Sequence, residues 1–255
     1  MLNLGARRRG LRKGYRLVMG KKRTLLLVNN SASSLFYWGM LLKRFSYRVI
    51  SARNGLNALR EMELNSPSIV LTDASLPDMT SADFLAKIKN APRFRNIPVI
   101  MLAAGDDQHA QEECQRIGFA GWLPKEVEPD VLYRTLQSLS EPIPRKYFRM
   151  ATSLTAVIGD GTVVGGTERT EQVTALSEGG MFVRTLYPQP QNAMTPVRLK
   201  IGDREVRAKA VVLYRSEEQQ ASEPGMGMKF VEISDDDRAV IRKFIKQELT
   251  RDIAR

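Results

Sequence analysis

The sequence predicts a chain in two parts: an α/β unit with a five-stranded parallel sheet, then a small antiparallel β-barrel that ends in a helix. Short apolar runs alternate with helical patterns five times between Thr24 and Leu139, as in a parallel sheet covered by helices on both faces. After Pro142 and Pro144 the pattern becomes an alternation of apolar and polar residues, which is typical of half-buried strands. A length of 255 residues accommodates two ordinary domains.

Five apolar runs have the length of strands. They are Leu25–Val28, Tyr47–Ile50, Ile69–Asp73, Val99–Leu102 and Gly121–Leu123. Each is followed by apolar residues spaced three and four apart, the spacing of one face of a helix. In the first helix these residues are Leu35, Trp38, Leu41, Leu42 and Phe45. Ligands of parallel sheets gather at the carboxyl ends of the strands, so the residues that end each run are candidate site residues.

The second half alternates apolar and charged residues and is predicted to close into a barrel. The alternation covers Val197–Ile201 and Val206–Tyr214. Asp160-Gly161 and Gly202-Asp203 are predicted as tight turns between strands. The last element is predicted as a helix that begins near Ser234, because a hydroxyl residue and three acids suit a helix N-terminus. Its apolar residues would cover the barrel; they are Val240, Ile241, Phe244, Ile245, Leu249 and Ile253.

The net charge of +11 is concentrated at the N-terminus. Residues 1–23 hold nine of the 39 Lys and Arg residues and no acid, so the remainder carries 30 basic against 28 acidic residues. Residues 1–20 are therefore predicted to be a basic disordered tail. Such a tail could touch nucleic acid or anionic lipid. The alternative is that translation starts at Met19, in which case the upstream residues are not part of the protein.

Composition also excludes some classes of function. The single cysteine, Cys114, excludes an internal disulfide and fits a reducing cytosol. No run approaches the ~18 apolar residues of a membrane helix, so a cytoplasmic protein without a membrane span is expected. A nucleic-acid-binding function ranks last, because the basic charge lies in the tail and no recognition helix is apparent.

Four stretches of the first half stand at the ends of predicted strands: LLLVNN, IVLTDASLPDMT, IPVIMLAAGDD and GWLPK. Together they resemble a response-regulator receiver domain, which has a flavodoxin-like fold, over essentially its whole length. The resemblance implies that Asp73 is the phospho-accepting aspartate, that Lys125 is the site lysine and that Trp122 is the switch aromatic.

Three residues depart from the receiver pattern. Asn29 and Asn30 stand where the family ordinarily has two acids, and Ala103 replaces a hydroxyl residue. Receivers transfer the phosphoryl group with magnesium, a hard cation held largely by carboxylates and waters. Two amides reduce a pocket of about three negative charges to one, so most of the attraction for a divalent ion disappears. The phosphorylation site is therefore predicted to be degenerate, with Asp73 and Lys125 persisting as a structural ion pair.

Three further stretches, RKYFR, ALSEGG and GMGMKFVEIS, follow in the second half. They resemble a PilZ domain, the bacterial receptor module for cyclic di-GMP. The resemblance implies that Arg145 and Arg149 form the RxxxR motif, and that Ser177 and Gly180 belong to the second motif, (D/N)xSxxG. Ala175 replaces the Asp or Asn of that motif, which removes a polar contact to guanine and costs ~1–3 kcal/mol.

The chemistry of the arginine side chain also fits a cyclic di-GMP site. Cyclic di-GMP carries two phosphates and two guanines, and an arginine fork binds phosphate or the O6/N7 edge of guanine with two parallel hydrogen bonds. Two arginines four residues apart near a linker could bind such a ligand from two sides. The alternative interpretation is that Arg145 and Arg149 are solvated linker charges.

The sequence thus predicts a bacterial signalling receptor or adaptor that is not an enzyme. It would bind cyclic di-GMP without a cofactor or a metal, and its degenerate receiver would contact an unknown protein partner. The expected boundaries are a tail at 1–20, a receiver-like domain at 21–140, a linker at 141–147 and a PilZ-like domain at 148–255. Two alternatives remain: a two-component regulator phosphorylated at Asp73, and an interaction scaffold that binds no ligand.

Overall fold

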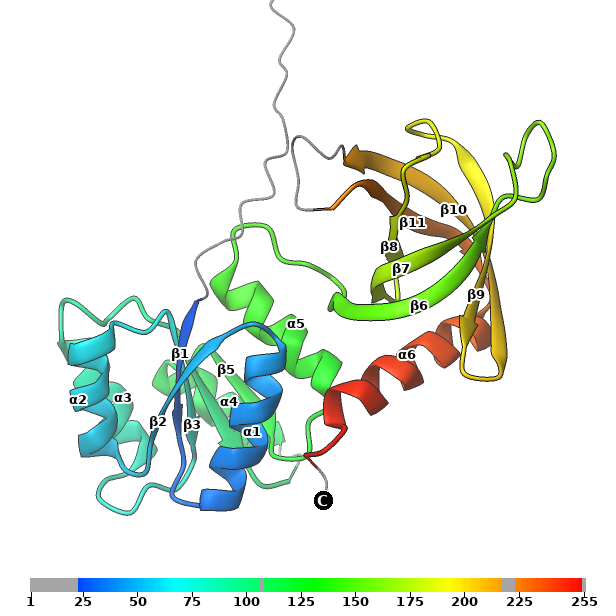
Figure 1. The fold of residues 1–255 in the computed structure, drawn as a ribbon. Helices are drawn as coiled ribbons and strands as arrows, with labels where there is room; N and C mark the ends of the chain where they lie inside the picture. Colours follow the sequence, from blue (N-terminus) through cyan, green and yellow to red (C-terminus); the bar gives the residue numbers. More distant parts are fainter. Residues whose placement is uncertain (1–22, 106–107, 217–222, 254–255) are drawn as a thin grey trace, which may run out of the picture.

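The computed structural model describes residues 23–105, 108–216 and 223–253. The predicted tail, residues 1–20, lies outside the described residues. The first half is a five-stranded parallel sheet with strand order β2-β1-β3-β4-β5 and helices on both faces (Figure 1). It is followed by a closed six-stranded antiparallel barrel with a C-terminal helix, so the predicted fold class is confirmed.

The strands of the sheet are short, and two of them are fully buried. Their bounds are β1 Thr24–Val28, β2 Arg48–Ala52, β3 Ile69–Asp73, β4 Val99–Ala103 and β5 Gly121–Pro124. The helices are α1 Ala32–Arg44, α2 Gly55–Asn65, α3 Ser81–Asn90, α4 Gln108–Ile117 and α5 Pro129–Ser140. All residues of β3 and β4 are buried. Continuous apolar runs are required there because helices cover both faces of the sheet.

Alternate residues of each strand enter two different cores. Leu25 and Leu27 of β1 pack with α1 and α5, whereas Leu26 and Val28 pack with α2, α3 and α4. The core on the α1 and α5 side continues into the barrel, so that one hydrophobic cluster joins both halves of the chain. This continuity was not predicted from the sequence.

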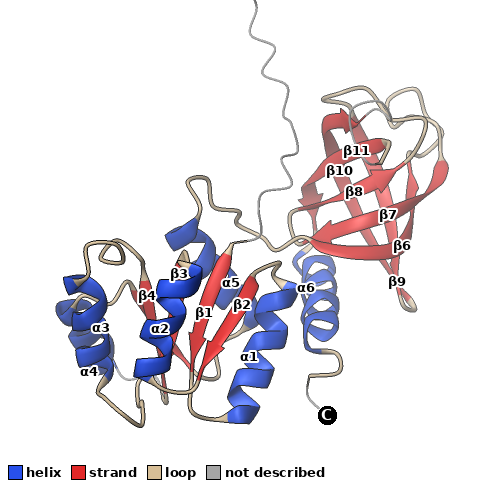
Figure 2. Ribbon diagram, turned by 60° about the vertical axis from the view of Figure 1, so that its left-hand side comes forward, coloured by secondary structure: helices blue, strands red, loops and turns tan. Residues whose placement is uncertain are grey.

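The barrel has strand order β10-β11-β8-β7-β6-β9 (Figure 2). Its strands are β6 Met150–Ile158, β7 Arg169–Ser177, β8 Gly180–Arg184, β9 Met194–Ile201, β10 Arg204–Ser216 and β11 Gly225–Ile233. The tight turn predicted at Gly202-Asp203 is confirmed, because these two residues alone separate β9 from β10.

The prediction of a tight turn at Asp160-Gly161 was wrong. These residues begin a longer loop, residues 159–168, between β6 and β7. The carboxylate of Asp160 accepts hydrogen bonds from the backbone N–H and the hydroxyl of Thr162, at 2.9 and 2.6 Å. The Asp-Gly pair therefore makes a local turn inside the loop, a conformation that Asp side chains favour, and does not connect the strands directly.

The C-terminal helix α6 (Asp235–Thr250) begins where the sequence predicted. The hydroxyl of Ser234 accepts a hydrogen bond from the backbone N–H of Asp237 at 3.1 Å, which caps the helix. Ile241, Ile245 and Leu249 are buried against the barrel, as expected. The helix also contacts α1 and α5 of the first half (Figure 1). None of the helices in the described ranges is both long and apolar enough to cross a membrane.

Candidate functional site

The carboxyl edge of the parallel sheet brings three predicted site residues together. Asn29 follows β1, Asp73 ends β3, and Lys125 follows β5. The amide nitrogen of Asn29 donates to Oδ2 of Asp73 at 2.7 Å, and Nζ of Lys125 lies 2.8 Å from the same oxygen. The backbone N–H of Lys125 donates to the carbonyl of Ala103 at 2.9 Å, which fixes the lysine at this edge.

Both carboxylate oxygens of Asp73 are occupied. Oδ1 accepts a hydrogen bond from the backbone N–H of Ser75 at 3.2 Å, and the residue is only 4% exposed. The carbonyl oxygen of Asn29 accepts from the backbone N–H of Ser31 at 2.8 Å, so the amide is held with its nitrogen toward Asp73. Asn30 is exposed and lies outside this network.

These residues do not fit the magnesium ion that receivers use. Magnesium prefers carboxylates, carbonyl oxygens and waters in octahedral geometry. Among the described residues of this network one carboxylate is present, and N–H donors face both of its oxygens. Across the described residues, no group of three or more His, Cys, Asp or Glu side chains is placed to hold a metal.

Trp122, predicted as the switch aromatic, lies in β5 and is 8% exposed. Its ring belongs to the core on the α2, α3 and α4 side, together with Met101 and Cys114. Its indole N–H has no hydrogen-bond partner within the described residues. An unsatisfied buried donor of this kind costs about 1–3 kcal/mol.

The second predicted site lies where the linker enters the barrel. Met150 of β6 pairs with Leu176 of β7, so Arg149 and Ser177, the next residues along these antiparallel strands, lie at the same end of the sheet. Ser177 in turn pairs with Gly180 across the turn between β7 and β8. The register therefore brings three of the four predicted ligand residues to one end of the barrel.

Ser177 and Gly180 shape the turn in this structure. The Ser177 hydroxyl is buried and donates to the Gly180 carbonyl at 3.0 Å. A Cβ added at Gly180 would lie 2.1 Å from the carbonyl oxygen of Met228 in β11, so only glycine allows this approach. Ala175 is partly exposed and pairs with Ala151 and Phe182.

Arg145 and Arg149 are both exposed, and the backbone N–H of Arg145 donates to the side-chain oxygen of Gln137 in α5 at 3.4 Å. Burial raises the pKa of the Tyr133 phenol in α5, and the positive charges of Arg145 and Arg149 oppose that rise. Neither guanidinium has a salt-bridge partner among the residues that the structure describes. The register therefore presents the Arg149 guanidinium beside the Ser177–Gly180 turn, and Arg145 lies four residues before it in the sequence.

Comparisons with known families identify both halves of the chain. The family model of the response regulator receiver domain matches residues 25–137, and that of the PilZ domain matches residues 144–247. The chain joins a receiver domain to a PilZ domain. Both are typically non-catalytic signalling modules.

Several individual proteins are similar to the receiver domain. The two-component response regulator-like APRR7 of Arabidopsis thaliana is 34% identical over 110 residues, 42% of this chain and 15% of its own length. The chemotaxis protein CheY1 of Helicobacter pylori is 26% identical over 115 residues, 44% of this chain and 93% of its own length. The chain therefore spans about a sixth of the length of the plant relatives. The solved structure of the chemotaxis response regulator CheY4 of Vibrio cholerae is 25% identical, with a TM-score of 0.44, over 47% of this chain and 99% of its own.

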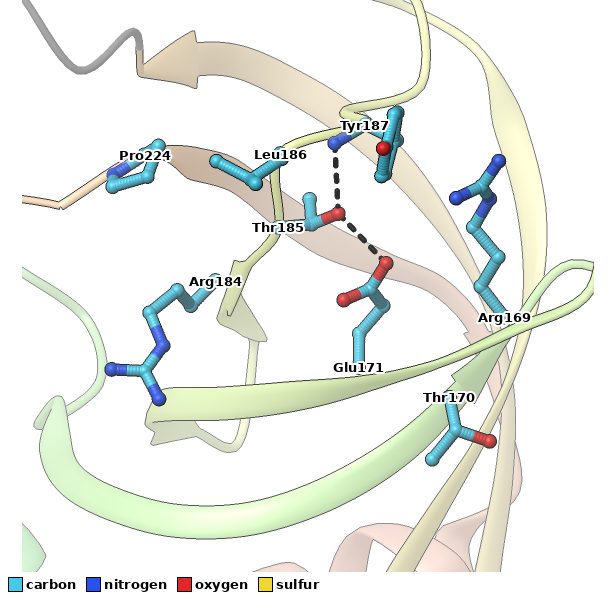
Figure 3. Close-up of a pocket in the computed structure, with 8 residues that line it drawn as sticks. All are labelled: Arg169, Thr170, Glu171, Arg184, Thr185, Leu186, Tyr187 and Pro224. Atoms are coloured by element: carbon cyan, nitrogen blue, oxygen red, sulfur yellow. Dashed lines mark hydrogen bonds between the residues drawn. The ribbon is translucent and has the colours of Figure 1, made fainter.

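A hollow of about 550 Å³ lies at the other end of the PilZ barrel, between the start of β7 and the end of β8 (Figure 3). Arg169 and Arg184 lie at opposite sides of it, and the Arg169 guanidinium stacks 4.3 Å from the centre of the Tyr187 ring. A buried hydroxyl, that of Thr185, donates to Glu171 at 2.7 Å within it. Neither arginine of the RxxxR motif lines this hollow, so it is separate from the predicted ligand site.

Sequence analysis missed Glu178, which lies between Ser177 and Gly180 and is 8% exposed. Its carboxylate accepts from Arg242 of α6 at 2.9 Å. An acidic residue inside a glycine-rich turn is ordinarily exposed to solvent, so the sequence around Glu178 does not indicate that its side chain is buried. The four-residue spacing of Arg238 and Arg242, one turn of helix, indicates that both could reach the same neighbour.

Proposed function

We propose that this chain is a signalling receptor that binds cyclic di-GMP through its PilZ domain and contacts a partner protein through a receiver domain that is not phosphorylated. The observation that carries the proposal is the register of β6 and β7, which sets Arg149 beside the Ser177–Gly180 turn. Two exposed arginines that form no salt bridge with any described residue suit a ligand with two phosphates, because charge-assisted bonds are about twice as strong as neutral ones.

The pseudo-receiver part of the proposal rests on Asn29. Its amide places a neutral N–H donor 2.7 Å from the Asp73 carboxylate, on the oxygen that Lys125 also contacts. A phosphoryl donor would have to displace both contacts without a metal to neutralise its oxygens. Incubation with acetyl phosphate and magnesium should therefore give no phosphorylated Asp73 by mass spectrometry. Appearance of that species would favour a phosphorylation-responsive regulator instead.

Calorimetric titration with cyclic di-GMP tests the ligand. Wild type should release heat on binding, and Arg145→Ala or Arg149→Ala should each abolish detectable binding. Arg204→Ala is the matched control, since Arg204 is also exposed but lies at the start of β10, beside the Gly202-Asp203 turn. Binding should weaken as salt rises, because ligand charges are being neutralised. Absence of heat from wild type at high ligand concentration would leave an interaction scaffold as the better description.

A further inference from the structure

Helix α6 holds the proposed ligand turn at two points. The Arg242 guanidinium donates to the Glu178 carboxylate at 2.9 Å, and Nη1 of Arg238 donates to the Glu178 backbone carbonyl at 2.8 Å. Glu178 is buried and directly follows Ser177. The side chain and the backbone of the same turn residue are thus both fixed by the N-terminal half of α6. An acid buried in this way would be strongly unfavourable without such partners.

The other end of α6 is held by the receiver domain (Figure 1). The Arg44 guanidinium, at the end of α1, donates to the backbone carbonyls of Glu248 at 2.8 Å, of Leu249, and of Arg251. Carbonyls in the last turn of a helix have no partner within the helix, so a cation there satisfies them and also suits the helix dipole. Nζ of Lys246 forms a second link, 2.6 Å from the carboxylate of Glu128.

The linker contacts the same turn from another side. The Tyr147 ring lies so close to Gly179 that a Cβ added there would be 2.6 Å from Cδ2 of the ring. The adjacent Phe148 inserts between receiver residues, with ring centres 5.2 Å from Phe45 and 5.3 Å from Tyr133. The turn is therefore joined to the receiver along two routes, one through α6 and one through the linker.

We propose that Glu178 is a positioning residue for the ligand turn, and that the receiver domain sets the affinity of the PilZ domain for cyclic di-GMP through α6. This inference rests on the proposed function. Arg44 binds the C-terminal carbonyls of α6, and α6 binds Glu178 through Arg238 and Arg242. Glu178 in turn fixes the conformation of the turn beside Arg149. A pre-organised site loses less conformational freedom on binding and so binds more tightly. By linkage, ligand binding must change the α6–receiver contact by the same free energy.

Two measurements on the full chain test the coupling. Arg44→Met keeps the unbranched apolar stem of the arginine side chain but removes the guanidinium, and with it the hydrogen bonds to α6. It should speed hydrogen exchange at the amides of Gly179, Gly180 and Met181, without any ligand present. It should also weaken cyclic di-GMP binding by about fivefold or more, the lower end of ordinary coupling between sites. Lys43→Met is the matched control, because Lys43 is the exposed neighbour of Arg44 on the same helix; it should change neither quantity.

Conservative replacement separates positioning from a general loss of stability. Arg242→Lys keeps a cation beside Glu178 and should retain most of the affinity, whereas Arg242→Ala and Glu178→Gln should lose it and expose the turn to exchange. Lys246→Met breaks only the exposed link to Glu128, and it serves where Arg44→Met does not fold.

The exchange measurement keeps this inference apart from the proposed function. If wild type binds no cyclic di-GMP but Arg44→Met still speeds exchange in the turn, the coupling stands and the ligand proposal fails. If Arg44→Met folds and leaves exchange and any measurable affinity as in wild type, the coupling is overturned. Where Arg44→Met does not fold, the same outcome for Lys246→Met overturns it.

Discussion

Asn29 shows how one amide changes the chemistry of a receiver site. Its nitrogen donates to Asp73 and its oxygen accepts from Ser31, so both ends of the amide are used within the fold. A carboxylate at this position would face Asp73 with like charge and would need a cation between them. Sequence alone predicted the missing charge. It did not predict the direct Asn29–Asp73 hydrogen bond, because that contact depends on how close the ends of β1 and β3 lie in space.

Restoring acids at this edge should restore affinity for magnesium. The double change Asn29→Asp, Asn30→Asp replaces a hydrogen bond with carboxylate repulsion. Without metal, the free energy of unfolding should therefore fall by about 1.5–3 kcal/mol, and the melting temperature with it. Magnesium should reverse the loss in proportion to its concentration, because a ligand that binds only the native state stabilises it. Differential scanning fluorimetry with and without magnesium measures both effects. Equal melting temperatures of the variant across that titration would contradict the assignment of this edge as a lost metal site.

Ala175 permits a second test at the scale of one residue. Ala175→Asn returns a polar side chain to the partly exposed position in β7 that the PilZ motif ordinarily gives to Asp or Asn. One recovered hydrogen bond is worth about 1–1.5 kcal/mol, or roughly tenfold in affinity for cyclic di-GMP. Asn adds no charge near the ligand phosphates, unlike Asp. Calorimetry on the variant should show the gain, and unchanged or weaker binding would mean that Ala175 does not face the ligand.

At the scale of elements, the RKYFR segment does more than the resemblance implied. Sequence analysis selected its two arginines, whereas the structure also gives roles to the two aromatic residues between them. Tyr147 lies on Gly179, and Phe148 packs between Phe45 and Tyr133. These contacts could not be predicted because the partners lie far away in the sequence, and a Tyr-Phe pair in a short linker has no periodicity that would show where it packs.

Removing the Phe148 ring should loosen the linker and lower stability. Phe148→Ala removes a partly buried aromatic ring and two ring contacts, which together stabilise the native state by about 2–3 kcal/mol. Phe36→Ala is the control, since Phe36 is 57% exposed on α1 and its loss should cost little. Urea unfolding of both variants measures the difference. Equal midpoints for Phe148→Ala and wild type would show that this ring does not hold the two domains together.

At the scale of the whole molecule, the two domains predicted from the sequence share one hydrophobic cluster. The cluster runs from β1 and α1 of the receiver through α5 and α6 into the barrel. The parallel sheet, the barrel and the terminal helix were each predictable, because each has its own periodicity. Their arrangement was not, since it depends on residues such as Arg44 and Lys246 that have the pattern of ordinary surface cations.

A shared core predicts that the receiver and PilZ domains unfold together. Domains with separate cores melt independently, whereas burial across the α1, α5 and α6 contact makes the folded state of each domain depend on the other. Calorimetry of the full chain should therefore show one transition, whose calorimetric and van't Hoff enthalpies agree. Phe45→Ala removes a buried ring that contacts Tyr133 of α5 and Phe148, and it should split that transition into two, with Phe36→Ala again as the control. Two resolved transitions in wild type would mean that the common cluster is too weak to couple the domains, and the link through α6 would then have to act between two independently folded units.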